Sequence, residues 1–212
     1  MIATPRRAAP LATALLAAAL PAAAQDRPVL TVYTYDSFVS DWGPGPQVEE
    51  AFEAICGCDL ELIGAGDGAA LLSRLRLEGE DTRADLVLGL DTNLMAEAKE
   101  TGLFAPHSRA MVATDVPGGW EDEVFLPYDW GWFAFVHDTT RLPEAPGSFA
   151  ELREADVSLV IQDPRSSTPG LGLALWIHAL HGDEAPAVWA DLAPKIVTVT
   201  KGWSEAYGLF LE

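Results

Sequence analysis

The sequence predicts an α/β protein made of two halves, each a parallel β-sheet with helices packed on it. Three observations support this: strand-like and helix-like segments alternate over residues 29–102, a second alternating series follows residue 125, and the segment at 85–90 is almost entirely apolar. Alternation of this kind is typical of parallel sheets, and a continuous apolar run is typical of a strand buried on both faces.

The first half contains three predicted strands and three predicted helices. The strand at 29–34 is rich in β-branched residues, and apolar residues from Val48 to Ile55 follow the i, i+3, i+4, i+7 spacing of a helix face. Asp67 is placed to cap the next helix, which Gly79 ends. The predicted elements are a strand at 29–34, a helix from 46, a strand at 60–63, a helix at 68–78, a strand at 85–90 and a helix at 93–101.

The second half begins with an aromatic segment at 130–136, which we predict to be a strand. Ser148 and Glu151 have the spacing of a capping box, and Thr168 followed by a proline predicts a helix that ends at Gly182. The remaining predicted elements are a strand at 159–161, a helix around Trp189, a strand at 196–200 and a helix opened by Ser204. Because this last helix is apolar and uncapped, we expect an incomplete second lobe and a C-terminally truncated chain.

Composition narrows the class of protein. Of the 212 residues, 49% are hydrophobic, which excludes a disordered chain, and the content of 18 Gly and 15 Pro excludes a coiled coil. The chain has 13 Lys and Arg against 32 Asp and Glu, a net charge of −19. Binding to a phosphate backbone or an anionic membrane surface needs clustered cations, so no nucleic acid partner is expected. A small cation fits this charge better.

The N-terminal segment reads as an export signal rather than as part of the fold. Arg6 and Arg7 precede an apolar stretch at 8–20, and three alanines follow just before Gln25. The prediction is therefore a cleaved signal peptide at 1–24, a first lobe at 25–124 and a second lobe at 125–212. The mature chain has no apolar run long enough to insert into a membrane.

Candidate binding residues follow the predicted strands, because ligands of open parallel sheets lie beyond the carboxyl ends of the strands. Acids, hydroxyls and aromatic rings recur there, a combination that suits an organic cation held between rings and a carboxylate. The alternatives are that Tyr35 and Trp42 only pack in the core, and that Asp67 and Asp91 only cap helices. The candidates are Tyr35, Asp36, Trp42, Asp67, Gly68, Asp91, Ser167, Thr168 and Trp203.

Signals for catalysis or for a metal site are scarce in the sequence. The four histidines do not gather at the strand ends, and no nucleophile, zinc-protease or phosphate-loop motif occurs. Cys56 and Cys58 are the only cysteines, and in an exported protein a structural disulfide is favoured over a redox pair or a metal clip. We therefore predict a binding protein without catalytic residues, resident metal or cofactor.

Several strings from these loops resemble the thiamine-binding periplasmic proteins of bacterial ABC importers. They are LTVYTYDSF, DWGPGP, RLRLEG, ADLVLGLD, TGLFAP, VPGGW, QDPRSSTPGLGLALW and VTVTKGWSEAYGLFL. The resemblance covers the whole mature chain. It implies a type II periplasmic binding-protein fold, in which two lobes close on a ligand. It also implies a periplasmic location and capture of thiamine, thiamine phosphate or thiamine diphosphate for a membrane permease and its ATPase.

The resemblance also implies which residues contact the ligand. These are Asp67, Gly68, Ser167, Thr168 and Trp203, with Tyr35 and Trp42 as further members from the first lobe. Two alternatives remain open at this point. One is a ferric-ion-binding protein of the same fold, for which the sequence offers four tyrosines but no adjacent pair. The other is a thiol-dependent periplasmic enzyme that uses Cys56 and Cys58.

Overall fold

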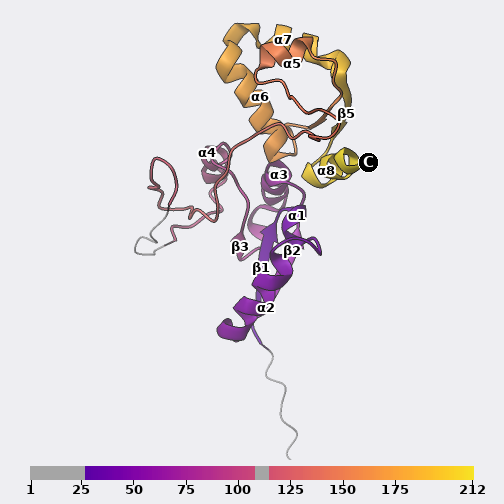
Figure 1. Ribbon diagram of the computed structural model, residues 1–212. Helices are drawn as coiled ribbons and strands as arrows, with labels where there is room; N and C mark the ends of the chain where they lie inside the picture. The colour runs from indigo at the N-terminus through magenta and orange to yellow at the C-terminus, as the bar shows by residue number, and fades with distance from the viewer. Residues whose placement is uncertain (1–26, 108–114) are drawn as a thin grey trace, which may run out of the picture.

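The computed structural model describes residues 27–107 and 115–212, so the predicted signal peptide lies outside the described residues. Figure 1 shows two stacked parts, one built on each of two parallel sheets. The elements of the first part are β1 (Val29–Thr34), α1 (Asp36–Val39), α2 (Gly45–Cys56), β2 (Asp59–Gly64), α3 (Gly68–Glu78), β3 (Leu86–Val87) and α4 (Met95–Glu100). Those of the second part are α5 (Phe149–Glu154), β4 (Leu159–Gln162), α6 (Thr168–His181), α7 (Ala185–Leu192), β5 (Ile196–Thr200) and α8 (Trp203–Leu211).

The first sheet has the strand order β2-β1-β3, and β1 pairs in parallel with both neighbours. Parallel neighbours need a crossover connection, and α2 and α3 provide these crossovers. The core on one face contains Tyr33 of β1 with Leu71 and Leu75 of α3, as the helical spacing predicts. All three strands therefore end at the same edge, where the loops carrying Tyr35 and Asp67 begin.

The second sheet pairs β4 with β5, again in parallel. Helices α5, α6 and α7 enclose its core, which centres on Phe149, Ile177, Val188 and Leu192. The predicted cap of α5 is confirmed, because the Ser148 hydroxyl accepts a hydrogen bond from the Glu151 N–H at 3.1 Å. The α/β class and the parallel sheets predicted from the alternation of elements are confirmed in both parts.

Two predicted strands differ from the structure. The segment at 130–136 forms no strand, and the strand predicted at 85–90 is reduced to β3. A strand needs a partner backbone, and the described residues place none beside 130–136; Trp132 is 80% exposed there. The predicted boundary between residues 124 and 125 falls in a long stretch from 101 to 148 in which the described residues form neither helix nor strand.

Helix α2 forms as predicted, but its apolar face is not buried. Val48 and Phe52 are exposed, and Ile55 is 81% exposed. The periodicity correctly predicted a helix, whereas burial depends on an element packed against that face, and the described part of the chain supplies none there. No helix in the described residues is long and apolar enough to cross a membrane.

Candidate functional site

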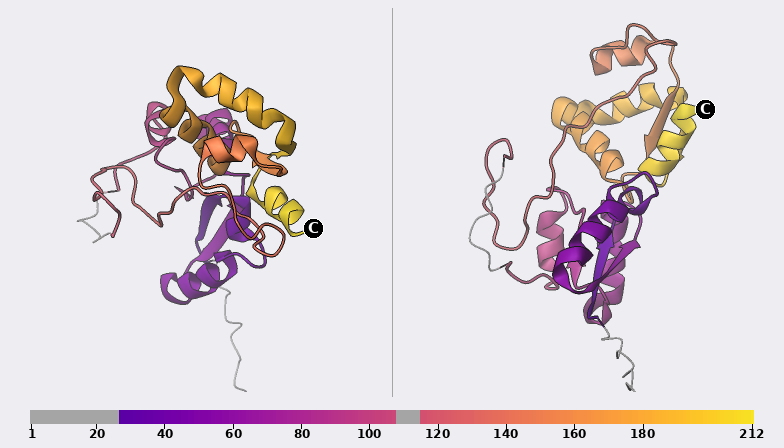
Figure 2. Two further views of the ribbon diagram at one scale, coloured as in Figure 1. Left: turned by 45° about the horizontal axis from the view of Figure 1, so that its top comes forward. Right: turned by 60° about the horizontal axis from the view of Figure 1, so that its bottom comes forward.

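The two sheets point the carboxyl ends of their strands toward a common junction. We use the name junction for the place where Trp42, Asp67 and Gly68 of the first part meet Ser167, Thr168 and Trp203 of the second. Figure 2 shows α8 beside the first part in both views. Hydrogen bonds cross the junction: the Asp67 Oδ2 accepts from the Trp203 N–H at 3.0 Å, and the Ala70 N–H donates to the Ser166 carbonyl at 3.2 Å.

Asp67 links the two parts instead of capping its own helix. It stands at the N-cap position of α3, yet its side chain makes no capping hydrogen bond, and its carboxylate accepts from Trp203 on α8. The residue is only 8% exposed, and this burial raises the pKa of the carboxyl above its ordinary value. The nearby Ser167 hydroxyl and the hydrogen bond from the Trp203 N–H oppose that rise.

Gly68 is the point of closest approach between α3 and α6. A Cβ at this position would lie 2.5 Å from the Thr168 Oγ1 and 3.0 Å from the Gly89 carbonyl oxygen. A side chain would thus overlap both neighbours, and only glycine allows the two helix N-termini to meet here. Gly68, which the sequence marked as a ligand contact, also packs against Thr168 and Gly89 in the structure.

Ser167 and Thr168 occupy different positions at the start of α6. Ser167 is fully buried and is the N-cap residue: its hydroxyl donates to the Gln162 Oε1 and accepts from the Gly170 N–H at 3.4 Å. The sequence assigned the cap to Thr168, which is instead the first residue of the helix and only partly buried. Of this pair, Thr168 has the hydroxyl that faces the junction, beside Gly68.

Three aromatic rings gather at the junction. The ring centroids of Trp42 and Trp203 are 5.6 Å apart with planes tilted by 49°, and Trp42 is 62% exposed. The Tyr207 ring stacks on Trp203, with the ring centroids 4.7 Å apart and the planes at 13°. Tyr207 was not among the residues predicted for the site, although its spacing of four residues from Trp203 on a helix was the signal that could have found it.

Tyr35 lies apart from these three rings. It packs edge-to-face against Phe38 at 5.5 Å, and its ring fills the space beside Gly89, whose Cβ position would be 2.3 Å from the Tyr35 Cδ1. Desolvation raises the pKa of the Tyr35 hydroxyl to about 12, and the nearby Asp129 and Tyr128 add to the rise. Tyr35 thus follows β1 as predicted and keeps a protonated hydroxyl.

Two cations stand next to Thr168. The Arg165 guanidinium pairs with Asp163 at 2.5 Å, and the Lys201 ammonium pairs with Glu205 at 3.1 Å. The loops that carry them are joined, because the Ser166 hydroxyl donates to the Lys201 carbonyl at 2.5 Å. Each of these cations is thus already paired with a carboxylate of the second part.

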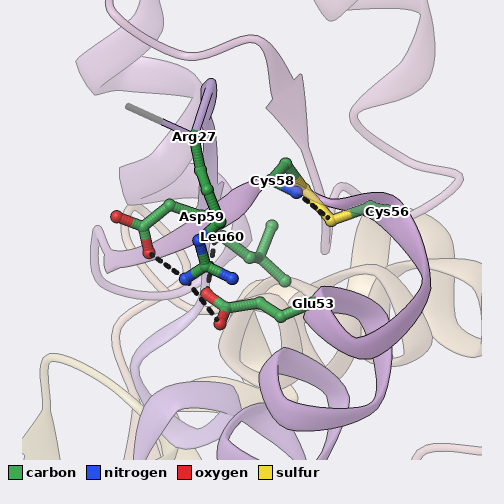
Figure 3. The surroundings of a disulfide bond; sticks show 6 residues. All are labelled: Arg27, Glu53, Cys56, Cys58, Asp59 and Leu60. Carbon is green, nitrogen blue, oxygen red and sulfur yellow. Dashed lines mark hydrogen bonds and ion pairs between the residues drawn. A yellow bond between two sulfur atoms is a disulfide. The ribbon is translucent and has the colours of Figure 1, made fainter. Parts of the chain in front are cut away.

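The two cysteines form a disulfide at the opposite edge of the first sheet (Figure 3). Cys56 ends α2 and Cys58 directly precedes β2, so the bridge lies at the amino end of this strand, whereas Asp67 follows its carboxyl end. Beside it, the Glu53 carboxylate accepts from the Leu60 N–H at 2.9 Å and pairs with Arg27 at 3.3 Å, and these contacts lower the pKa of Glu53. A disulfide at this place anchors α2 to β2, remote from the junction.

No metal centre is apparent in the part of the chain that the structure describes. Within residues 27–107 and 115–212, no three His, Cys, Asp or Glu side chains are grouped closely enough to hold an ion. The junction therefore offers one buried carboxylate, a hydroxyl at a helix N-terminus and stacked aromatic rings. These groups suit an organic cation better than a bare metal ion.

The fold has the architecture of a periplasmic binding protein: parallel α/β sheets whose strands end at a shared junction. Comparison with solved structures identifies a periplasmic thiamin binding protein that superposes with a TM-score of 0.85 at 58% identity, over 87% of this chain and 59% of that chain. The thiamine-binding periplasmic protein of Escherichia coli (strain K12) is 58% identical over 188 residues, covering 88% of this chain and 58% of the relative. The predicted resemblance is thus confirmed.

The same comparisons place two limits on this relationship. The chain spans about three fifths of the length of the curated relatives it matches (58% and 61% for two of them), and no family model matches it. For the ferric alternative, the iron uptake protein A1 of Synechocystis is a much more distant relative, 27% identical over 148 residues. The chain is thus similar to thiamine-binding periplasmic proteins at 54–58% identity over most of its own length.

Proposed function

We propose that this protein is the periplasmic thiamine-binding component of an ABC importer. One observation carries the proposal: the junction brings a buried carboxylate, Asp67, together with the Trp42–Trp203 ring pair, in which each part contributes one ring. Thiamine presents a cationic thiazolium and a flat aminopyrimidine, and aromatic faces attract cations. The Escherichia coli relative and the superposed solved structure are both named as periplasmic proteins that bind thiamine.

Each junction residue has a proposed role. Trp42 and Trp203 stack on the rings of the ligand, and Asp67 accepts a hydrogen bond from the exocyclic amine. A carboxylate offers about four acceptor sites, so the bond from the Trp203 N–H leaves capacity for this. Gly68 lets the two parts approach each other, and Tyr35 contributes its ring beside Gly89.

The hydroxyl or phosphate end of the ligand is proposed to bind at Thr168. The Ser167 hydroxyl already donates to Gln162 and accepts from Gly170, so Ser167 supports the loop rather than the ligand. Thr168 begins α6, whose N-terminus favours negative charge. Thiamine phosphate and thiamine diphosphate are therefore included among the proposed ligands.

The remaining parts of the proposal concern the export of the protein and the transport of its ligand. We propose that residues 1–24 are a signal peptide removed on export, and that the mature protein delivers its ligand to a membrane permease with its ATPase. No enzymatic activity and no cofactor form part of this function. The ferric alternative is disfavoured because iron prefers tyrosinate ligands, whereas desolvation raises the pKa of both Tyr35 and Tyr128.

Isothermal titration calorimetry with thiamine, thiamine phosphate and thiamine diphosphate tests the proposal. We expect saturable binding that Trp203→Ala weakens by at least tenfold and that Asp67→Asn also weakens. Trp132→Ala is the matched control, because this tryptophan is highly exposed and pairs with Trp130 rather than with a junction residue. Absence of binding to all three ligands, or equal binding by the Trp203 and Trp132 variants, would contradict it.

A further inference from the structure

We propose that Tyr207 is a positioning residue that orders the Trp203 indole for ligand binding. The inference deepens the proposed function and rests on it. The Tyr207 ring lies 4.7 Å from the Trp203 ring with their planes only 13° apart, a stacked pair. In the described residues, the other partner of this indole is Trp42, whose ring is tilted by 49°. Tyr207 is therefore the ring that lies parallel to the Trp203 indole, whereas Trp42 meets it at an inclined angle.

The position of Trp203 explains why it needs such support. It is the first residue of α8, and helical side chains usually rest on the turn that precedes them. No preceding helical turn exists at the first position. Tyr207 is four residues further along, and a side chain at that position points back toward the N-terminus and covers the first residue.

Two contacts then hold Trp203, one from the first part and one from its own helix. Its backbone N–H donates to the Asp67 carboxylate at 3.0 Å, and its ring stacks on Tyr207. The Gly202 that precedes it supplies no side-chain cap. With both its backbone and its ring held, the indole presents one defined face toward Trp42.

The geometry of the Trp42–Trp203 pair suggests which ring moves when a ligand enters. A flat ligand between two rings needs about 3.5 Å on each side, or about 7 Å in total. The two centroids are 5.6 Å apart, so one ring must shift. Trp42 is mostly exposed, whereas Trp203 is held at two points. Trp203 is the fixed wall and Trp42 is the adaptable one.

Tyr207→Ala, Tyr207→Phe and Leu209→Ala form the test. Leu209 is the control, because it is on the same helix and is 44% exposed, close to the 42% of Tyr207. Stacking needs the ring and not the hydroxyl, so Tyr207→Phe should bind thiamine as the unaltered protein does. Tyr207→Ala should weaken binding by about two- to tenfold, the range expected for one aromatic pair, and Leu209→Ala should leave it unchanged.

Near-ultraviolet circular dichroism gives a readout that does not depend on ligand. The tryptophan signal should fall in Tyr207→Ala and persist in Tyr207→Phe and Leu209→Ala. In a Trp203→Ala background, Tyr207→Ala should cause no further loss of affinity. Unchanged affinity and dichroism in Tyr207→Ala, or equal losses in Leu209→Ala, would overturn the inference. If the unaltered protein does not bind thiamine, the proposed function fails, and the dichroism alone decides whether Tyr207 orders Trp203.

Discussion

Replacing Gly68 by alanine tests the packing on which the junction depends. The new Cβ would lie 2.5 Å from the Thr168 Oγ1 and 3.0 Å from the Gly89 carbonyl oxygen. The Thr168 hydroxyl can be displaced by rotation of its side chain, but the Gly89 oxygen belongs to the backbone. Overpacking of this kind costs about 1–3 kcal/mol, against a gain in helix propensity of up to about 1 kcal/mol.

We therefore expect Gly68→Ala to lower the free energy of unfolding by about 1–2 kcal/mol, measured by urea denaturation followed by tryptophan fluorescence. Gly208→Ala is the matched control, because Gly208 is also helical and an added Cβ there meets nothing within 4 Å. This control should raise stability by about 0.5–1 kcal/mol. Combining Gly68→Ala with Thr168→Ala should recover part of the loss, since the closest overlap is removed.

Equal stability of the Gly68 and Gly208 variants would refute the reasoning, because the close approach of α3 and α6 would then not exist in solution. The reasoning would also be refuted if the effects of Gly68→Ala and Thr168→Ala on the free energy of unfolding were simply additive. Residues in contact show coupling energies of about 0.5–3 kcal/mol, whereas distant residues do not. A lowered thiamine affinity in Gly68→Ala would further connect this contact to the proposed function.

Three further predictions concern charge, the disulfide and a helix cap. Burial raises the pKa of Asp67, so the stability that this group contributes is present below its ordinary pKa of 3.8 and is lost as the pH rises through the raised value. In urea unfolding from pH 3 to 7, the free energy of unfolding of Asp67→Asn should therefore increase relative to that of the unaltered protein as the pH rises. Asp163→Asn should show the opposite trend, because Arg165 lowers the pKa of Asp163 to about 2 and its contribution is lost as pH falls toward that value. If the stability of both variants relative to the unaltered protein changed with pH in the same direction, these pKa shifts would be contradicted. Removing the Cys56–Cys58 disulfide by reduction should lower stability by about 1–2 kcal/mol, as expected for a very short loop, and should leave thiamine affinity unchanged; lost affinity would argue against a purely structural bridge. Ser148→Ala should cost about 1 kcal/mol through the lost cap of α5, and a loss below about 0.3 kcal/mol in thermal unfolding would contradict that hydrogen bond.

Local signals predicted the helices well because they are set by residues close in the chain. Ser148 caps α5 as its spacing to Glu151 predicts, and α3 ends at Gly79, whose φ of +55° favours glycine. The boundaries shift only slightly: α6 is capped by Ser167 rather than Thr168, and α8 starts one residue before Ser204. A capping hydrogen bond and a glycine with positive φ involve only a few neighbours, so sequence reasoning captures them.

Strands and buried faces were predicted less well because they depend on distant partners. The segment at 130–136 has the β-branched and aromatic character of a strand, but no strand pairs with it within the described residues. Helix α2 has the right period, yet Ile55 remains exposed. Periodicity states which side chains share a face, and only the fold decides what covers that face.

The sequence by itself determined the α/β class, most of the helices and strands, and the loops that follow the strands. Trp42, Asp67, Thr168 and Trp203 were predicted as site residues because they lie in those loops, and parallel strands all end at one edge of the sheet. This rule can be applied without coordinates. The tertiary structure alone decided what these residues do to one another. Asp67 accepts from the Trp203 N–H across 136 residues of chain instead of capping α3. A contact over that separation depends on how the two sheets are placed, and no local pattern encodes such a placement.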